Sequence, residues 1–151
     1  MKRLLFCLIA FAINSCDKTA ISSIPYSLVY LELDLTFEDK DLVPSLAYKI
    51  YTPQNINQSI EKTGFGGVLV YHGVNGTGAD AYYAFDLACP LEADRLVRVE
   101  VDDEHLHAVC PKCQSTYDLI FGLGNPVSGP SREQLKPYPV VVSGNTLRIR
   151  N

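Results

Sequence analysis

The chain has 151 residues, enough for one domain with a hydrophobic core. Apolar residues make up 47% and charged residues 20% of the chain, which excludes a disordered protein. The formal net charge is -4 and no cluster of Lys and Arg occurs, so nucleic-acid binding is excluded because it needs positive charge to neutralise phosphates.

The first residues have the features of an export signal. Lys2 and Arg3 precede the apolar run Leu4–Ile13, which is too short to span a membrane permanently. The next residues, Asn14-Ser15-Cys16, place a small residue before a cysteine, and the whole segment resembles a bacterial lipoprotein signal. The resemblance implies a signal peptide over residues 1–15 and a lipidated Cys16. A secretory signal cleaved nearby is the alternative.

Either signal takes the protein out of the cytoplasm. The lipoprotein signal predicts a protein of the bacterial cell envelope, on the periplasmic or surface face of a membrane to which Cys16 anchors it. Residues 16–24 are then the lipidated cysteine and a short linker, and residues 25–151 are one domain. No later segment is long and apolar enough to be a transmembrane helix.

The domain contains several short patterns that are typical of strands. Tyr26–Leu35 alternates apolar and polar residues, which predicts a half-buried strand. Val68–Tyr71 is apolar at every position and predicts a strand covered on both faces. Tyr82–Asp86 predicts the next strand, which leads directly to Cys89.

Further strands follow at close spacing. Leu96–Asp102 alternates, a turn begins at Asp102, and His105–Val109 returns, with His105 and His107 on the face opposite to Cys110. Tyr138–Val142 and Thr146–Arg150 predict a closing hairpin. No long amphipathic helix is evident, so the sequence predicts an all-β barrel or sandwich.

Two Cys-Pro turns lie on either side of the central predicted hairpin. The first is Cys89-Pro90-Leu91, and the second is Cys110-Pro111-Lys112-Cys113. Cys7 is lost with the signal and Cys16 is lipidated, so three cysteines remain. An odd number in an exported protein indicates either one disulfide with a spare thiol or a metal that takes all three.

These residues resemble the Rieske-type iron–sulfur domain, whose pattern is Cys-x-His, a spacer, and Cys-x-x-His. Cys89 and Cys110 match the two cysteines, and Ser128-Gly129-Pro130 matches the loop that follows. The resemblance covers roughly Tyr26 to Asn151. It implies a Rieske-like antiparallel β-barrel or sandwich with a small cluster-binding-type subdomain over residues 88–130. It also implies a two-iron two-sulfur (2Fe-2S) cluster and electron transfer to a redox partner.

The ligand set departs from the family at the two histidine positions. A Rieske cluster has two Cys ligands on one iron and two His ligands on the other. Leu91 stands at the first His position and cannot bind metal, while Cys113 stands at the second and can. The nearby substitutes for the missing ligand are Glu92, Asp94, His105 and His107, and strand alternation disfavours the two histidines.

Four states of the three sulfurs are therefore open. The first is a 2Fe-2S cluster with Cys89, Cys110 and Cys113 as ligands, and the second is a zinc site built on the same residues. The third is a Cys89–Cys110 disulfide, because the resemblance places these sulfurs close together. The fourth is three reduced, packed thiols without a cofactor.

Two functions correspond to these states. With a cluster, the protein is an exported, membrane-tethered electron-transfer protein and not an enzyme by itself. Without one, it is a structural or interaction module on the cell surface that binds a protein partner. A hydrolase or transferase has no support, because no acid/base pair or nucleophile–base arrangement is evident.

Overall fold

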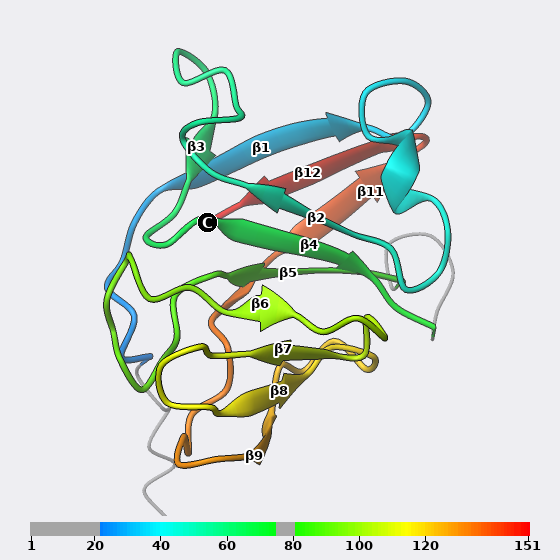
Figure 1. Ribbon diagram of the computed structural model, residues 1–151. Helices are drawn as coiled ribbons and strands as arrows, with labels where there is room; N and C mark the ends of the chain where they lie inside the picture. Colours follow the sequence, from blue (N-terminus) through cyan, green and yellow to red (C-terminus); the bar gives the residue numbers. More distant parts are fainter. Residues whose placement is uncertain (1–21, 75–80) are drawn as a thin grey trace, which may run out of the picture.

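The computed structural model describes residues 22–74 and 81–151, so the expected signal peptide and Cys16 lie outside the described residues. The described part of the chain consists of strands and one short 3-10 helix, η1 (Figure 1). The elements in chain order are β1 (Val29–Asp34), η1 (Lys40–Leu42), β2 (Tyr48–Tyr51), β3 (Lys62–Thr63), β4 (Val68–His72), β5 (Tyr82–Asp86), β6 (Glu100–Val101), β7 (His107–Val109), β8 (Thr116–Asp118), β9 (Pro126–Ser128), β10 (Pro137–Tyr138), β11 (Val140–Ser143) and β12 (Thr146–Arg150).

The first sheet joins the beginning and the end of the domain in the strand order β11-β12-β1-β3 (Figure 1). β1 alternates buried and exposed side chains, as the sequence predicted, and Val29, Leu31 and Leu33 face the core. The antiparallel register pairs Leu31 with Ile149 and Leu33 with Leu147. Apolar pairs on one face of a sheet both stabilise it and fix its register.

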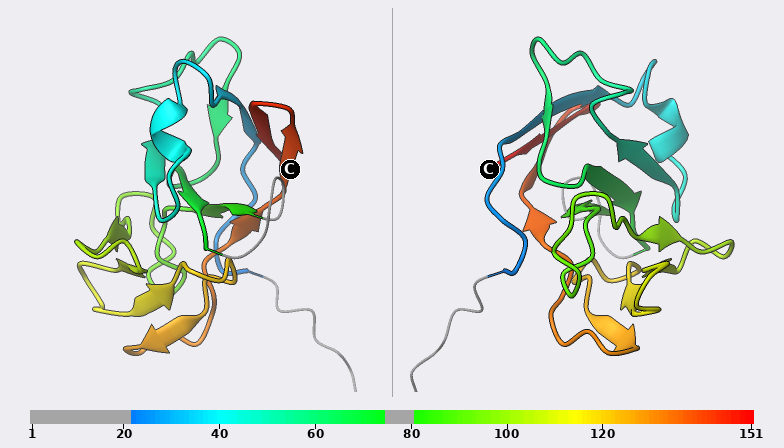
Figure 2. Two further views of the ribbon diagram at one scale, coloured as in Figure 1. Left: turned by 90° about the vertical axis from the view of Figure 1, so that its right-hand side faces the viewer. Right: turned by 60° about the vertical axis from the view of Figure 1, so that its left-hand side comes forward.

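The second sheet, β10-β5-β4-β2, lies between the first sheet and the third (Figures 1 and 2). β4 is buried on both faces, which confirms the covered strand that its sequence predicted. Val68 and Val70 belong to the core that this sheet shares with β1 and β12. Leu69 and Tyr71 belong to a second core, which lies against the third sheet.

The third sheet has the order β6-β7-β8-β9 and forms a small subdomain at the lower end of Figure 1. β7 and β8 form an antiparallel hairpin in which Val109 pairs with Thr116. The turn of this hairpin contains Cys110 and Cys113. The short strand β9 pairs with β8 through Ser128 and Thr116, which brings the Gly/Pro loop alongside the cysteines.

The structure confirms the expected fold class, an all-β architecture of antiparallel sheets with a small subdomain. The predicted strand Leu96–Asp102 is shorter than expected, because only Glu100–Val101 belongs to the third sheet. The preceding residues instead bond to the first Cys-Pro turn: Cys89 N donates to Val97 O, and Ala88 forms an isolated bridge with Arg98.

The predicted closing hairpin also differs at its first strand. Tyr138 pairs with Ala84 in the second sheet, whereas Val140–Ser143 pairs with β12 in the first. Pro139 stands between these two segments and has no N–H group, so one continuous ladder cannot form there.

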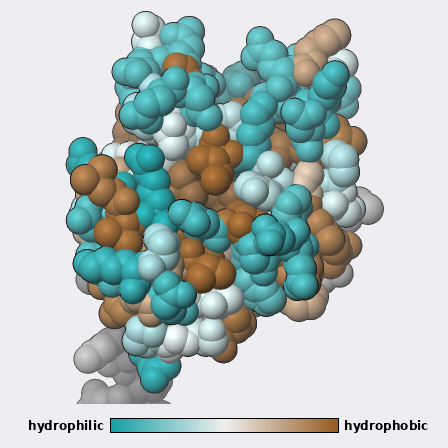
Figure 3. Space-filling model, viewed as in Figure 1, coloured by the Kyte–Doolittle hydropathy of each residue, from teal (hydrophilic) through white to brown (hydrophobic). Residues whose placement is uncertain are grey.

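The outer surface is largely polar in the view of Figure 1, with apolar side chains gathered near its centre (Figure 3). Among residues 22–74 and 81–151, the structure contains no helix long and apolar enough to cross a membrane.

Candidate metal centre

The first Cys-Pro turn leaves the second sheet at the end of β5. Asp86, the last residue of β5, accepts a hydrogen bond of 2.8 Å from Ala88 N and so sets the direction of the chain into Cys89. Cys89 O then accepts from Ala93 N at 2.9 Å, which closes the turn. Ala93 has a positive φ of 47°, and this left-handed conformation reverses the chain.

The second Cys-Pro turn joins β7 to β8. Cys110 N donates to Ser115 O at 2.9 Å, and Gln114 N donates to Cys110 O at 3.0 Å. Gln114 has a φ of 60°, so the chain turns back immediately after Cys113. An ion pair between Lys112 and Glu92 joins the two turns.

The two turns bring Cys89, Cys110 and Cys113 together, as the sequence predicted for its candidate ligands. Their three sulfur atoms all lie within 4.8 Å of one another, and Cys89 Sγ is 3.6 Å from Cys113 Sγ. Cys89 and Cys110 are fully buried, and Cys113 is half-buried. All three are free thiols in this structure.

Two hydroxyl groups lie against these sulfurs. Tyr117 Oη is 3.3 Å from Cys89 Sγ, and Ser115 Oγ is 3.2 Å from Cys113 Sγ. Ser115 Oγ also accepts a hydrogen bond of 3.0 Å from Ser131 N, which leaves the hydroxyl proton of Ser115 available to a thiolate. Neither hydroxyl was assigned a role from the sequence. The sequence did contain an indication of this role. Ser115 and Tyr117 follow Cys113 at alternate positions, so both side chains can point to the same side as the cysteine.

The three thiols differ in acidity. Burial raises the pKa of the Cys110 thiol to about 12, although backbone N–H groups of Lys112 and Cys113 act in the opposite direction. Burial also acts to raise the pKa of Cys113, but hydrogen bonds from Ser115 and from the other two cysteines outweigh it, so the pKa is lowered. Burial, followed by the contact with Cys89, raises the pKa of Tyr117, so its hydroxyl stays protonated and can donate to sulfur.

The residues that were considered as a fourth ligand point elsewhere. His107 Nδ1 is 3.0 Å from Asp102 Oδ2, and His105 Nδ1 is 3.1 Å from Leu46 O. The predicted strand His105–Val109 begins only at His107, because His105 lies in the preceding turn with a φ of 59°. Glu92 pairs with Lys112, and Asp94 accepts a hydrogen bond from Leu96 N. Within the described residues, no imidazole or carboxylate group joins the three sulfurs.

The two-iron cluster of the Rieske family therefore does not fit the residues present. Such a cluster takes four protein ligands, two on each iron. Cys89, Cys110 and Cys113 supply three sulfurs, and no fourth thiolate, imidazole or carboxylate among the described residues lies beside them. Leu91, at the position of the missing ligand, has an apolar side chain that is 48% exposed.

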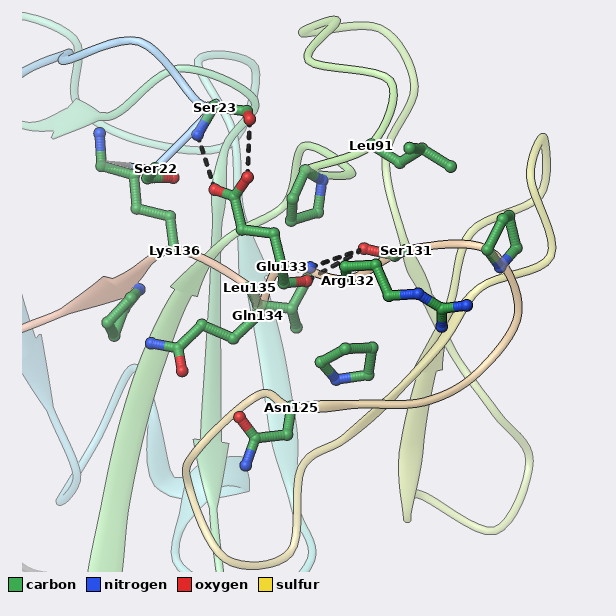
Figure 4. A pocket seen from close by; sticks show the side chains of 14 residues that line it. Ser22, Ser23, Leu91, Asn125, Ser131, Arg132, Glu133, Gln134, Leu135 and Lys136 are labelled. Carbon is green, nitrogen blue, oxygen red and sulfur yellow. Dashed lines mark hydrogen bonds between the residues drawn. The ribbon is translucent and has the colours of Figure 1, made fainter. Parts of the chain in front are cut away.

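A groove of about 780 Å³ lies beside the first Cys-Pro turn and is lined in part by Pro90, Leu91 and Pro130. Figure 4 shows Glu133 at its edge, pointing towards Ser23, and Glu133 accepts hydrogen bonds of 2.6 Å from both the backbone N–H and the hydroxyl of Ser23. Ser23 is therefore attached to the domain at the edge of this groove.

Two Cys-Pro turns thus meet over a small sheet that packs against the larger antiparallel sheets, and a Gly-Pro loop runs beside them. This is the arrangement that the resemblance to the Rieske-type domain implies. No protein-family model matches the sequence, and no curated protein matches it.

Several solved structures are similar to this chain, all at low sequence identity. One is a chain from a complex of reduced oxygenase and oxidized ferredoxin in carbazole 1,9a-dioxygenase, with 15% identity over 79% of this chain and 99% of that one and a TM-score of 0.49. The carbazole 1,9a-dioxygenase ferredoxin of Nocardioides aromaticivorans has 20% identity over 82% and 95%, with a TM-score of 0.45. A ferredoxin of Sphingomonas yanoikuyae has 18% identity over 61% and 81%, with a TM-score of 0.41.

Proposed function

We propose that this chain is an exported, membrane-tethered Rieske-like protein that binds metal through Cys89, Cys110 and Cys113. The observation that supports metal binding is the convergence of three free thiols within 4.8 Å, from two turns that are distant in sequence. Cysteines that only fill space in the core need not lie next to one another. Three neighbouring sulfurs are a strong ligand set for thiophilic metals.

The surroundings of the sulfurs also favour bound thiolates. Tyr117 and Ser115 place hydroxyl groups beside two of the sulfurs, and backbone N–H groups of Lys112 and Cys113 face the third. Hydrogen bonds to a charged acceptor contribute about 1.5–3 kcal/mol each, so these groups would stabilise thiolates that are otherwise costly to bury. Metal binding would thus remove the protons that burial retains on Cys110.

Metal analysis of the chain as the cell makes it tests this proposal. The full chain is produced in an export-competent bacterial host, purified in detergent without reductant, and assayed for iron, zinc, copper, acid-labile sulfide and free thiols. We expect bound metal in the wild type and its loss in Cys110→Ser, with Cys7→Ser as the matched cysteine control. A metal-free wild type would contradict the proposal. A Cys110→Ser variant that contains as much metal as the wild type would also contradict it.

The same assay examines the alternative function, a cluster-free structural or interaction module with a Cys89–Cys110 disulfide. The proximity of the three sulfurs and the groove beside Pro90 and Leu91 favour this candidate. It requires one free thiol among the three, no metal, and a mass lower by two hydrogen atoms than that of the reduced chain. Electron transfer to a redox partner follows from the family resemblance, and it would need a ligand that the described residues do not supply.

The anchor is the second part of the proposal, and its support is the sequence of residues 1–16. Growth with a fatty-acid analogue followed by mass analysis of the mature chain tests it. We expect the wild type and Cys7→Ser to be labelled and to begin at Cys16, and Cys16→Ser to remain unlabelled. A mature chain that begins at another residue and carries no lipid would instead support the secretory signal.

A further inference from the structure

The number and spacing of the donors at the cysteines differ from those of a two-iron centre. Each cysteine offers one sulfur, and no histidine, aspartate or glutamate among the described residues joins them. Sulfurs bound to one ion at about 2.3 Å lie roughly 4 Å apart in tetrahedral or trigonal geometry. The 3.6 Å between Cys89 Sγ and Cys113 Sγ is close to this value. In a two-iron cluster these two positions belong to different irons, which the bridging sulfides hold apart.

The surroundings of the three sulfurs restrict a fourth ligand. Cys89 and Cys110 are fully buried in an apolar cluster that contains Leu87, Val99 and Ala108. The polar groups beside the sulfurs are the hydroxyls of Tyr117 and Ser115, which already contact Cys89 Sγ and Cys113 Sγ. The apolar side chains around Cys89 and Cys110 offer a water molecule no further partner. An ion that is stable with three ligands therefore suits the site better than one that requires four.

The charge of the donor set points to a soft ion of low charge. Soft thiolate ligands select Cu(I), zinc and iron–sulfur clusters. Zinc is almost always four-coordinate in structural sites, whereas monovalent copper, which has a filled d shell and low charge, is stable with two or three sulfurs. The hydrogen-bond donors from Tyr117, Ser115 and the backbone of Lys112 would partly neutralise the excess negative charge of the thiolates.

We infer that Cys89, Cys110 and Cys113 together bind one Cu(I) ion in a three-coordinate, all-sulfur site in place of the two-iron cluster of the Rieske family. This inference rests on the proposed metal-binding function and names its metal. Three copper–sulfur bonds form and up to three thiol protons pass to solvent. The copper remains monovalent throughout, so no oxidant or reductant is consumed.

Anaerobic titration with Cu(I) in competition with a coloured chelator tests this assignment. The full chain carrying Cys7→Ser and Cys16→Ser is used, because Cys89, Cys110 and Cys113 are then its only cysteines. We expect one copper per chain, a near-ultraviolet sulfur-to-copper absorption band, and an X-ray absorption spectrum that fits three sulfur neighbours and no nitrogen or oxygen. Each of Cys89→Ser, Cys110→Ser and Cys113→Ser should weaken copper binding at least 100-fold.

Restoring the family ligands provides the opposite test. The double variant Leu91→His/Cys113→His recovers the two-Cys, two-His set and should bind two irons and two sulfides when reconstituted, with weakened Cu(I) binding. Binding of two irons and two sulfides by the unaltered cysteines, or of zinc in preference to Cu(I), would overturn the copper assignment while leaving metal binding intact. A chain that binds none of these metals would overturn both.

Discussion

Tyr138 Oη donates a hydrogen bond of 2.6 Å to Asp86 Oδ2, and both residues are buried. The same carboxylate accepts from Phe65 N, Gly66 N and Ala88 N, so all of its partners are neutral donors. Asp86 thereby joins β10, the loop before β4 and the start of the first Cys-Pro turn. Through its hydrogen bond with Ala88 N, the carboxylate holds the backbone in place immediately before Cys89.

Asp86→Asn is expected to lower the free energy of unfolding by about 2–3 kcal/mol, because an amide nitrogen cannot accept the hydrogen bonds that one carboxylate oxygen now receives. Urea denaturation followed by circular dichroism measures the change. Asp103→Asn, at an exposed turn residue, is the matched control and should change the stability by no more than about 0.5 kcal/mol. Equal effects of the two substitutions would contradict the role assigned to Asp86.

Alkaline pH should destabilise the domain through its buried tyrosines. Burial is the largest cause of a raised pKa at each of Tyr51, Tyr71, Tyr82, Tyr117 and Tyr138. Below an unfolded pKa of about 10 both states keep their phenolic protons, and stability does not depend on these groups. Above it the unfolded chain loses protons that the folded chain retains, so stability falls as pH rises, by up to about 1.4 kcal/mol per pH unit for each tyrosine.

Denaturation midpoints measured between neutral pH and about pH 11 test this dependence. Tyr82→Phe should make the fall in stability above pH 10 less steep, because it removes a tyrosine whose pKa burial raises in the folded state. Tyr26→Phe is the control, since Tyr26 is 75% exposed and should leave the slope unchanged. A flat stability profile to about pH 11 would rule out the expected linkage.

Asp102 stabilises the turn between β6 and β7 at neutral pH. Its carboxylate accepts from Leu106 N at 2.8 Å and from both the backbone and the ring of His107. Burial acts to raise its pKa, but these hydrogen bonds outweigh burial and the pKa is lowered. The folded state therefore gains stability from Asp102 above the unfolded pKa of about 4, and this gain is lost as pH falls through the lower folded pKa.

The expected effect of Asp102→Asn is a loss of about 1 kcal/mol at pH 7, with the gap between variant and wild type narrowing below about pH 4. Urea midpoints at several acidic pH values measure this gap. Because the side chain is partly exposed, the loss should stay well below that of Asp86→Asn. A gap that widens on acidification would show that Asp102 acts otherwise than as a carboxylate acceptor.

The metal-free, reduced chain should react with alkylating agents first at Cys113. This thiol is half-buried with a lowered pKa, whereas Cys110 is fully buried with a pKa of about 12. Since the thiolate is the reactive form, we expect Cys113 to be modified at least tenfold faster than Cys110 near pH 8. Peptide mapping by mass spectrometry after short exposure to iodoacetamide measures both rates, and equal rates would contradict the prediction.

Gly129 allows the Gly/Pro loop to lie against the second Cys-Pro turn. Its φ is +86°, and a Cβ atom there would lie 2.5 Å from Ser115 Cα and 2.9 Å from Gln114 O. Gly129→Ala should lower the stability by about 3 kcal/mol or more, because both the left-handed backbone and the contact are unfavourable. Gly144→Ala shares the positive φ of 60° but meets nothing within 4 Å, and should lose only about 1–2 kcal/mol. Denaturation of the two variants side by side separates the contact from the backbone conformation.

Much of the fold could be predicted because the pattern of apolar residues in each strand indicates whether one or both of its faces are buried. The alternation around Leu31 and Leu33 and the unbroken apolar run of β4 describe a half-covered and a fully covered strand, and both appear as expected. The division of the closing segment at Pro139 was not predicted, although a residue without an N–H group is a visible signal. Which sheet each half joins depends on contacts with β5 and β12, which a local pattern does not contain.

The candidate ligands were predicted from the resemblance to the Rieske-type domain, and the structure brings their sulfurs together. The family resemblance located Cys89 and Cys110, while Cys113 followed from its place in the second turn. Partners such as Lys112 for Glu92 could not be predicted, because both lie on turns whose side-chain directions depend on the folded positions of the turns. The same dependence concealed the hydroxyl group of Tyr117 beside Cys89.

The second sheet lies between two hydrophobic cores and contributes side chains to both, since alternate residues of β4 face opposite sides of it. Barrel and subdomain therefore cannot separate without exposing Leu69 or Val70, which makes the whole domain one cooperative unit. Leu91 and Cys113, the two positions at which the Rieske pattern would have histidines, lie on turns outside the second sheet. Substitutions at these two positions should therefore change the metal ligands without disturbing the sheet that supports the turns.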